Sequence, residues 1–283
     1  MIIRLYIFWL VIISIIFSIS YYKKSRETLL RVISFFVILN VISLAYILGV
    51  YGVIGFATLI LLLSIYELSK IYKYKHPFLL TFIILGAYML MLYFNSYLPY
   101  VVPLFLIIVI FTFTGKSENI KNNFYIYSFG VLVLATCAAS LVSLYQLKPE
   151  SILLLITLLV INDVTGYFVG RKFGKIRIFK TLSPKKSLEG YMGSMVGIVI
   201  GIIVFHSILP VLTGTSLLQN FILLIFFFIF GNAGDLLFSK IKRILEIKDF
   251  SNLLPGHGGI LDRFDNVLSV SPLFLILLLY YLK

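Results

Sequence analysis

The stretch from Gly231 to Asn266 reads GNAGDLLFSKIKRILEIKDFSNLLPGHGGILDRFDN. It begins at the end of an apolar segment, passes through charged residues and a glycine-rich turn, and enters the last apolar segment. Five of the eleven acidic residues lie here: Asp235, Glu246, Asp249, Asp262 and Asp265. Because 61% of the chain is hydrophobic, charges of both signs gathered so closely predict a site for a metal ion and phosphate groups at a membrane surface.

The composition excludes a soluble domain. The mean hydropathy is +1.07 and 12% of residues are charged, whereas a globular chain carries about 25%. Several apolar runs are long enough for bilayer-spanning helices, which predicts an all-α, polytopic integral membrane protein with about 9–10 transmembrane helices. We place the spans near 2–20, 29–46, 48–66, 77–94, 98–114, 124–146, 151–170, 190–210, 217–238 and 267–282.

The net charge of +13 could suggest a nucleic-acid partner, but the basic residues lie in short loops between apolar runs. With these spans, all but three of the 24 basic residues fall on one side; the exceptions are Arg4, Lys148 and Lys283. The positive-inside rule makes that side cytoplasmic and places both termini outside. We therefore expect contacts with membrane lipids and none with nucleic acid. The basic residues follow the first apolar run, which favours a retained span over a cleaved signal peptide.

The chain changes character near its middle. Residues 1–120 have short loops, interfacial tyrosines and no acid inside a predicted span, which predicts an N-terminal membrane-spanning scaffold region. Residues 121–283 form the predicted catalytic membrane region, with cytoplasmic loops 171–189 and 239–265. Inside it Asp163 lies within a span, where a carboxylate is costly and therefore indicates function. Two sets of glycines at four-residue spacing are better explained by helix packing: Gly166 and Gly170 in this span, and Gly193, Gly197 and Gly201 in the next.

The loop RKFGKIRIFKTLSPKKSLEG, from Arg171 to Gly190, has seven basic residues and one acid. The positive-inside rule explains the number of basic residues but not their arrangement. In the SPKKS run from Ser183, the proline sets a turn and Ser187 could cap the next helix. A helix N-terminus beside Lys185 and Lys186 suits a phosphate group.

If the helix before this stretch continues past Gly234, Asp235, Ser239, Lys242 and Arg243 share one face. That arrangement suits a metal-chelated phosphate, although an ion-paired interfacial helix would share it. Asp262 and Asp265, three residues apart, share a face where the last span begins. A carboxylate from each of two segments, completed by substrate phosphates and water, is a usual Mg²⁺ site. The scattered histidines and the single cysteine do not make a zinc site.

The run from Ser239 to Asp265, SKIKRILEIKDFSNLLPGHGGILDRFD, resembles the complete signature of the phosphatidate cytidylyltransferase (CDP-diacylglycerol synthase) family. The positions that carry the resemblance are Ser239, Ile241, Lys242, Arg243, Lys248, Asp249, Ser251, Leu254, Pro255, His257, Gly258, Gly259, Ile260, Asp262, Arg263, Phe264 and Asp265. Asp163 with the following GYFVGRKFG run, the SPKKS run and Gly234–Asp235–Leu236 agree in order. The resemblance covers roughly residues 160–270, with two departures: Phe238 replaces an expected glutamate and Leu188 an expected aromatic residue.

This resemblance implies transfer of CMP from CTP to phosphatidate, which gives CDP-diacylglycerol and pyrophosphate for phospholipid biosynthesis. It implies Mg²⁺, allows a second, monovalent cation and a homodimer, and places the enzyme in the cell inner or plasma membrane. The implied catalytic residues are Asp235 and Asp262 as metal-holding carboxylates, with Asp265, Lys242, Arg243, Lys248, Asp249 and Arg263. The implied substrate-binding residues are Asp163, Arg171, Ser183, Lys185, Lys186, Ser239, His257, Gly258 and Gly259.

Two alternatives keep different parts of the pattern. A related nucleotidyltransferase or kinase acting on another lipid would use the same charged residues. A secondary transporter of an anionic solute would use Asp163 and the basic loop, but it predicts polar residues leading through several spans to the outer side, where charge is scarce. His257 would donate to a phosphate or a base if it faces the site, and is otherwise a solvated loop residue.

Overall fold

The computed structural model describes residues 26–72, 85–86, 88–89, 92, 123–179, 183–206, 214–254 and 258–280. Within these ranges the protein consists of helices joined by loops, with no β-strand beyond two isolated bridges. The helices are α2 (Arg26–Ile47), α3 (Gly49–Tyr72), α7 (Asn123–Leu147), α8 (Glu150–Phe173), α9 (Leu188–His206), α10 (Leu217–Ile244) and α11 (Leu261–Tyr280). The predicted all-α fold is confirmed.

The helices have the length and composition of membrane spans. Among the described residues, four helices are long and apolar enough to cross a bilayer: α3, α8, α9 and α10. The chain is therefore a multi-pass integral membrane protein. The predicted spans 29–46, 48–66, 124–146, 151–170, 190–210, 217–238 and 267–282 correspond to these seven helices. The predicted spans 2–20 and 98–114, and most of 77–94, lie outside the described residues.

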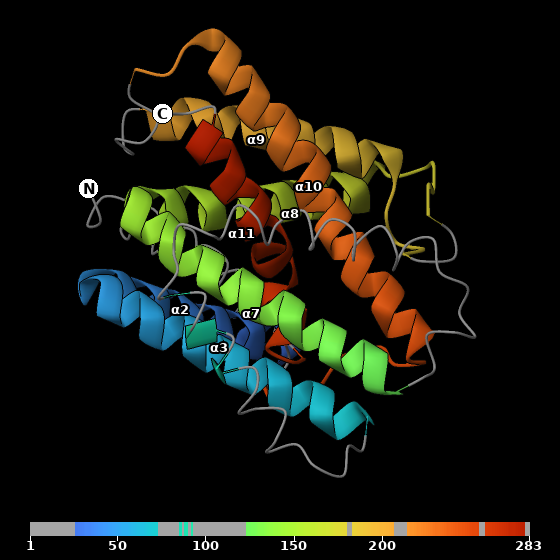
Figure 1. Cartoon of the computed structure of the whole chain (residues 1–283). Coiled ribbons are helices and arrows are strands. Elements are labelled where there is room, and N and C mark those ends of the chain that lie inside the picture. The colour runs from blue at the N-terminus through green and yellow to red at the C-terminus, as the bar shows by residue number, and fades with distance from the viewer. Residues whose placement is uncertain are drawn as a thin grey trace.

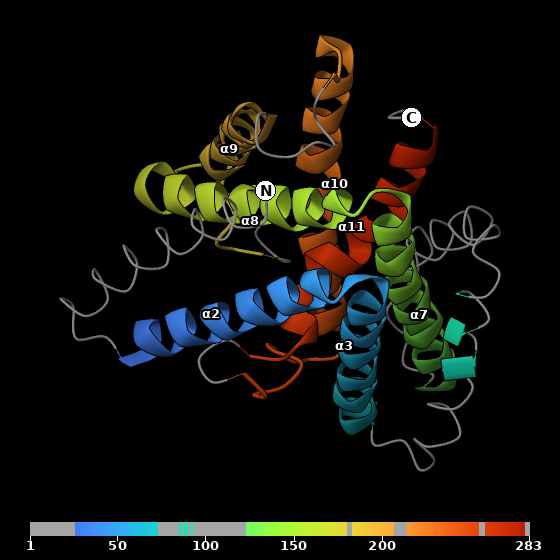
Figure 2. The same cartoon turned by 90° about the vertical axis from the view of Figure 1, so that its left-hand side faces the viewer.

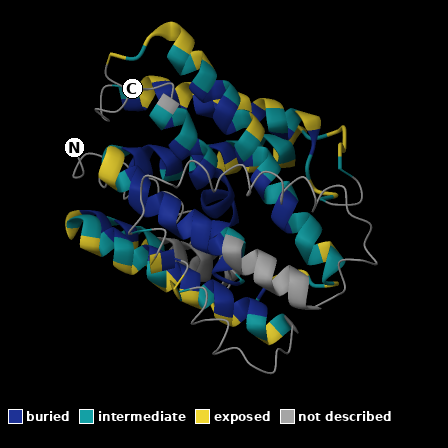
Figure 3. Cartoon of the chain, in the orientation of Figure 1, coloured by how far each residue is buried: buried dark blue, intermediate teal, exposed yellow. Residues whose placement is uncertain are grey.

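Helix α11 lies in the middle of the bundle and contacts α7, α8 and α10 (Figure 1). Its buried side chains, among them Val270, Phe274 and Leu278, form the centre of the apolar core. Buried residues are concentrated on α7, α8 and α11, while the outer helices expose apolar side chains, as lipid-facing helices do (Figure 3). The C-terminal helix therefore holds the α2–α3–α7 side and the α8–α9–α10 side together.

Glycines let α8 and α9 pack very closely. A Cβ atom at Gly193 would lie 2.5 Å from Cβ of Val169, and one at Gly197 would lie 2.2 Å from Oγ1 of Thr165. Neither position has room for a larger residue without movement of α8. The expectation that these glycines serve packing is confirmed, and α8 and α9 lie against each other (Figure 2).

Ser187 immediately precedes α9 and caps it, as the sequence predicts. Its Oγ accepts a hydrogen bond from the Gly190 backbone N–H at 3.2 Å, which satisfies one of the free N–H groups at a helix start. The loop before it is fastened by a backbone bridge between Arg177 and Ser187 and by a hydrogen bond from the Arg177 guanidinium to the Lys185 carbonyl. These contacts fix the backbone from which Lys186 projects.

Candidate active site

Helix α10 continues as regular helix through Gly234 to Ile244. The condition for the predicted charged face is therefore met: Asp235, Ser239 and Lys242 follow one another along one side of the helix. Asp235 and Lys242 are seven residues apart, or about 10 Å along the axis at about 1.5 Å per residue. Two groups of charged side chains form at these two levels of α10.

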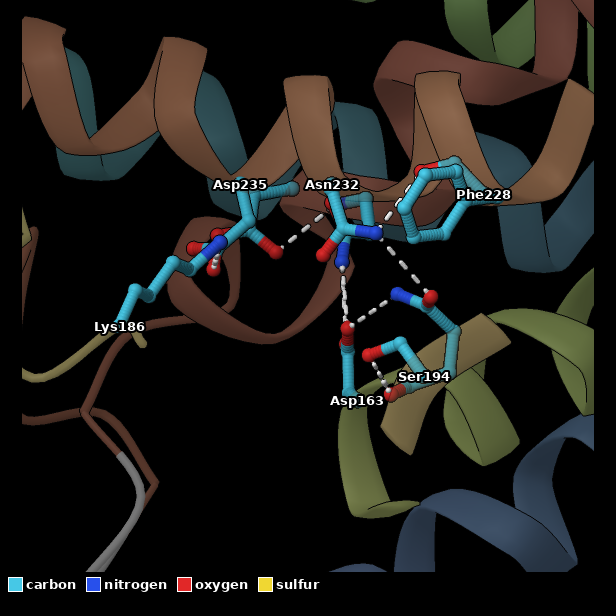
Figure 4. A network of polar contacts seen from close by, with 9 residues as sticks. Asp163, Lys186, Ser194, Phe228, Asn232 and Asp235 are labelled. Atoms are coloured by element: carbon cyan, nitrogen blue, oxygen red, sulfur yellow. Dashed lines mark hydrogen bonds and ion pairs between the residues drawn. The ribbon is translucent and has the colours of Figure 1, made fainter. Parts of the chain in front are cut away.

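The first group, called here the membrane-side cluster, contains Asp163, Lys186, Asp235 and Asp265. Its strongest contact is the ion pair between Lys186 Nζ and Asp235 Oδ2 at 2.6 Å (Figure 4). The two side chains are 21% and 34% exposed, so the pair stays accessible from outside. Burial lowers the pKa of the Lys186 ammonium, but the carboxylate of Asp235 outweighs this and raises the pKa above its usual value. Lys186 is therefore a stable cation.

Asp163, on α8, is held in this cluster by amide side chains. Asn266 Nδ2 donates to both of its carboxylate oxygens, at 3.2 and 3.0 Å, and Asn162 Nδ2 donates to Oδ1 at 3.1 Å. Asn162 in turn accepts from Asn232 at 3.3 Å, and its backbone carbonyl accepts from Ser194 Oγ (Figure 4). Amides from α8, α10 and α11 therefore fix one carboxylate at the helix crossing.

Asp265, from α11, completes the cluster. It is buried, and the Asn266 backbone N–H donates to its Oδ1 at 2.8 Å. Asp235 lies close enough to interact electrostatically with both Asp163 and Asp265. Near them the buried Oδ1 of Asn266 has no hydrogen-bond partner among the residues that the structure describes. Asp265 also interacts electrostatically with Lys242. Among the described residues, three carboxylates and the Asn266 oxygen therefore lie near two cations, Lys186 and Lys242.

The second group centres on Asp262, in the first turn of α11. Its Oδ1 accepts from Lys242 Nζ at 2.8 Å, and its Oδ2 accepts from the backbone N–H groups of Phe250 and Gly259, at 2.8 and 2.9 Å. The Asp262 side chain is only 3% exposed. Asp262 therefore closes the α10–α11 loop onto the end of α10, and few of its oxygen lone pairs remain for another ligand.

Apolar contacts support the same loop. The ring of Phe250 packs edge-to-face on Phe238 with centroids 6.1 Å apart, and Lys242 Nζ lies 5.6 Å from the centre of the Phe250 ring. Phe238 is the residue that replaces the expected glutamate. In this chain the position therefore holds the loop by packing, and no acidic group is added there.

The glycine-rich turn needs its glycines for two different reasons. Gly258 has φ +86°, a conformation that residues with a Cβ rarely adopt, and it pairs with Leu254 through two backbone hydrogen bonds. Gly259 has no room for a Cβ, because Glu67 approaches it closely. His257 lies outside the described residues, so its role stays a prediction.

The other predicted site residues are exposed or partly buried. Arg171 donates to the hydroxyl of Tyr167 at 3.1 Å, and the Ser183 carbonyl accepts from the Lys186 N–H at 3.1 Å. Those with exposed side chains are Arg171, Lys185, Arg243, Lys248, Asp249 and Arg263; Ser183 and Ser239 are partly buried. The roles of these residues stay predictions.

The donor set can be compared with what a metal ion requires. Among the described residues, no group of three or more His, Cys, Asp or Glu side chains is arranged to hold a metal ion. Mg²⁺ is usually held by one or two protein carboxylates together with substrate phosphates and water, so it needs no such group. The carboxylates of the membrane-side cluster and the free Asn266 oxygen are the hard oxygen donors that Mg²⁺ prefers. Asp235 and Asp265 therefore fit, whereas Asp262 is already occupied by Lys242 and the loop.

Sequence reasoning missed three residues that the structure brings into or next to the site. Asn232 and Asn266 lie within the quoted stretch, and their polar side chains in an apolar environment were an available signal. Glu67 lies one residue beyond the predicted span 48–66, a position where a charged residue at the membrane interface is expected. Helix α3 continues to Tyr72, however, so Glu67 is inside the helix and its side chain is fully buried.

The fold and the site together define a multi-pass, α-helical membrane protein with carboxylates and cations gathered where α8, α9, α10 and α11 approach one another. The profile of the cytidylyltransferase family matches residues 29–281. The chain belongs to this family.

Named relatives agree with this assignment. The chain is 36% identical to a phosphatidate cytidylyltransferase of Aquifex aeolicus over 157 residues, 56% of this chain and 58% of that protein. It is 34% identical to the phosphatidate cytidylyltransferase of Bacillus subtilis over 187 residues, 62% of this chain and 67% of that protein. The matching enzyme of Staphylococcus saprophyticus is 33% identical, over 60% of this chain and 66% of that protein. The matches thus span about two thirds or less of these relatives.

Proposed function

We propose that this protein is a phosphatidate cytidylyltransferase, which transfers CMP from CTP to phosphatidate and releases pyrophosphate. The observation that carries the proposal is the ion pair between Lys242, near the end of α10, and Asp262, at the start of α11. It folds the signature run into one unit beside the carboxylates of the membrane-side cluster. The family match and the names of the relatives support the same reaction.

In this reaction an oxygen of the lipid phosphate forms a bond with the α-phosphorus of CTP. The bond from that phosphorus to the oxygen bridging to the β-phosphate breaks, and its electron pair leaves with pyrophosphate. The lipid phosphate is already an anion, so no strong general base is needed. The obstacle is repulsion between negative groups, which cations held in fixed positions reduce.

We assign these residues roles by their contacts. Asp235, one-third exposed and near Asp265, is the first candidate to hold Mg²⁺. The sequence assigns Asp262 to the same role, but we propose that Asp262 holds the α10–α11 loop instead, because Lys242 and two backbone N–H groups donate to its oxygens. When bound, the ion would neutralise phosphate charge and order the triphosphate. Lys242, Arg243, Lys248 and Arg263 are assigned to the phosphates of CTP; Ser183, Lys185 and Lys186 are assigned to the second phosphate group.

We propose that the site opens to the cytoplasm. Lys186 belongs to loop 171–189, and Lys242 and Asp262 belong to loop 239–265. The positive-inside rule places both loops on the cytoplasmic side. A site at that interface would receive a soluble nucleotide from one direction and a lipid from the other. The second, monovalent cation and the homodimer remain expectations from the family resemblance.

The test is reconstitution of the purified full chain with CTP, Mg²⁺ and phosphatidate. We expect CDP-diacylglycerol and pyrophosphate in equal amounts, no product in excess EDTA, and recovery when Mg²⁺ is restored. Diacylglycerol and a polyprenyl phosphate, each offered in place of phosphatidate, test the other-lipid alternative. Product from one of these lipids and none from phosphatidate would replace the proposal by that alternative.

The transporter alternative gains no support from the named relatives. A direct comparison is uptake of labelled CTP or inorganic phosphate into vesicles that contain the protein but no phosphatidate. We expect no protein-dependent uptake, because the proposed reaction occurs at one membrane face. Uptake that requires the protein would contradict this expectation.

A further inference from the structure

Glu67 is a fully buried carboxylate on α3, in the N-terminal region that the sequence predicts to be a scaffold. Its Oε1 accepts from Ser251 Oγ at 2.6 Å and from the Ile260 backbone N–H at 2.7 Å, and its Oε2 accepts from the Leu261 N–H at 2.9 Å. A carboxylate inside an apolar helix is costly to bury, and three hydrogen bonds to the charged form offset that cost. Each of the three donors belongs to the α10–α11 loop or to the start of α11.

These bonds make Glu67 a cap supplied by a distant helix. The N–H groups at the start of a helix have no partner inside the helix, and the helix dipole favours a negative charge there. A Cβ at Gly259 would lie 2.7 and 2.8 Å from the two Glu67 oxygens. The glycine at this position is therefore explained by the approach of Glu67.

Glu67 and Asp262 divide the donors of one turn between them. Asp262 takes the N–H of Gly259, and Glu67 takes those of the next two residues, Ile260 and Leu261. Three consecutive backbone N–H groups thus donate to two carboxylates that come from different helices. Because Asp262 also holds Lys242, a shift of this turn would move the ammonium that the proposed reaction uses.

We propose that Glu67 is a positioning residue for the candidate active site: it fixes the turn before α11 and thereby the Asp262–Lys242 pair. The inference rests on the proposed function for its catalytic consequence. It also assigns α3 to the working site, so the predicted N-terminal scaffold region supplies a residue on which the site depends. Glu67 itself touches neither the membrane-side cluster nor, by its contacts, a substrate.

The first measurement follows the turn without any assay of activity. Hydrogen–deuterium exchange of the full chain in detergent would compare wild type with Glu67→Gln. We expect peptides covering residues 250–264 to exchange at least tenfold faster in the variant, because its amide offers a donor where the Leu261 N–H needs an acceptor. Ser64→Ala is the matched control: Ser64 is buried one turn away on α3, and within the described part of the chain its hydroxyl has no hydrogen-bond partner. Unchanged exchange in Glu67→Gln would overturn the proposal.

The second measurement is kinetic. For equal amounts of folded protein, isolated as a single species, we expect Glu67→Gln to lower kcat/KM for CTP by about 10²-fold, the usual effect of a misplacement near 1 Å. The KM for phosphatidate should stay near that of wild type, as should all constants of Ser64→Ala. A merely structural role would lower the folded yield and leave the kinetic constants per folded molecule unchanged, and that result would also overturn the proposal.

Gly259→Ala provides a second variant if Glu67→Gln fails to fold. The added methyl would collide with the Glu67 carboxylate, so we expect the same increase in exchange over residues 250–264. In a Glu67→Ala background the collision is removed, and the two effects should be strongly non-additive. Additive effects would contradict the inferred contact between residue 259 and Glu67. If wild type forms no CDP-diacylglycerol, the proposed function fails, while the exchange data still decide whether Glu67 holds the turn.

Discussion

Asp235 and Asp262 each pair with a lysine, but they differ in how exposed they are and in how many hydrogen bonds they accept. Asp235 pairs with Lys186, and both side chains remain partly exposed. At Asp262 a carboxylate is almost completely buried and each of its oxygens accepts from the protein itself. The difference indicates a division of labour, because a carboxylate open to solvent can exchange its partner for a ligand, whereas a saturated one holds the backbone.

The largest effect on activity is expected for the partly exposed carboxylate, Asp235. Asp235→Asn should lower kcat by at least about 10²–10³-fold, the usual result of removing a charged group from a transition state. The melting temperature should fall little, since a partly exposed ion pair contributes about 0–1 kcal/mol. CDP-diacylglycerol formation and thermal unfolding in detergent measure the two quantities. Activity close to wild type would remove Asp235 from the site.

Asp262→Asn tests the buried carboxylate that pairs with Lys242. Removing one partner of a buried ion pair costs about 3–5 kcal/mol, so this variant should unfold at a clearly lower temperature than Asp235→Asn. Its folded fraction should keep more activity than Asp235→Asn does. If Asp262→Asn instead melts like wild type and is fully inactive, Asp262 acts as a metal ligand and the proposed division of labour is wrong.

Lys186 tests whether the open ion pair also serves a phosphate. Lys186→Gln should lower kcat/KM for CTP or phosphatidate by about 10- to 100-fold, because a hydrogen bond to a charged group contributes about 1.5–3 kcal/mol. Lys186→Arg is the matched control, since it keeps the charge and should retain more activity. If both variants are as active as wild type, Lys186 pairs with Asp235 and does not bind a phosphate.

The smallest effect is expected from the helix cap behind Lys186. Ser187→Ala removes the cap of α9, worth about 1 kcal/mol, and should lower activity about fivefold or less. Ser216 caps α10 in the same way, through a capping box at the helix end away from the site, and Ser216→Ala is the control. The two variants should lose similar stability, and only Ser187→Ala should lose activity. If both variants lose the same amount of activity, the Ser187 cap has no specific effect on the candidate site.

Much of the fold follows from local sequence. The apolar runs predict the seven described helices because each run must hydrogen-bond its own backbone in a bilayer, and a helix does so without partners. The SPKKS run predicts a capped helix start at Ser187, and the structure has it there. The charged face of α10 follows from the 3.6-residue period once the helix continues past Gly234.

Local sequence does not say which charges meet. The sequence pairs Asp235 with Asp262 because a carboxylate from each of two segments is a usual Mg²⁺ site. In the fold Asp235 instead contacts Lys186 from the α8–α9 loop, and Asp262 contacts Lys242. These choices depend on how α8, α9, α10 and α11 cross, and the crossing is set by close packing at residues such as Gly193 and Gly197.

The sequence by itself determined that this is a membrane-spanning, all-helical protein of the cytidylyltransferase family with its charges near two loops. Only the tertiary structure decided that Asp262 closes the loop and that Glu67, about 190 residues earlier, caps the helix that carries it. The physical reason is the range of the forces involved. Helix formation and apolar burial are specified by neighbouring residues, whereas a buried carboxylate takes its role from the donors that folding brings to it.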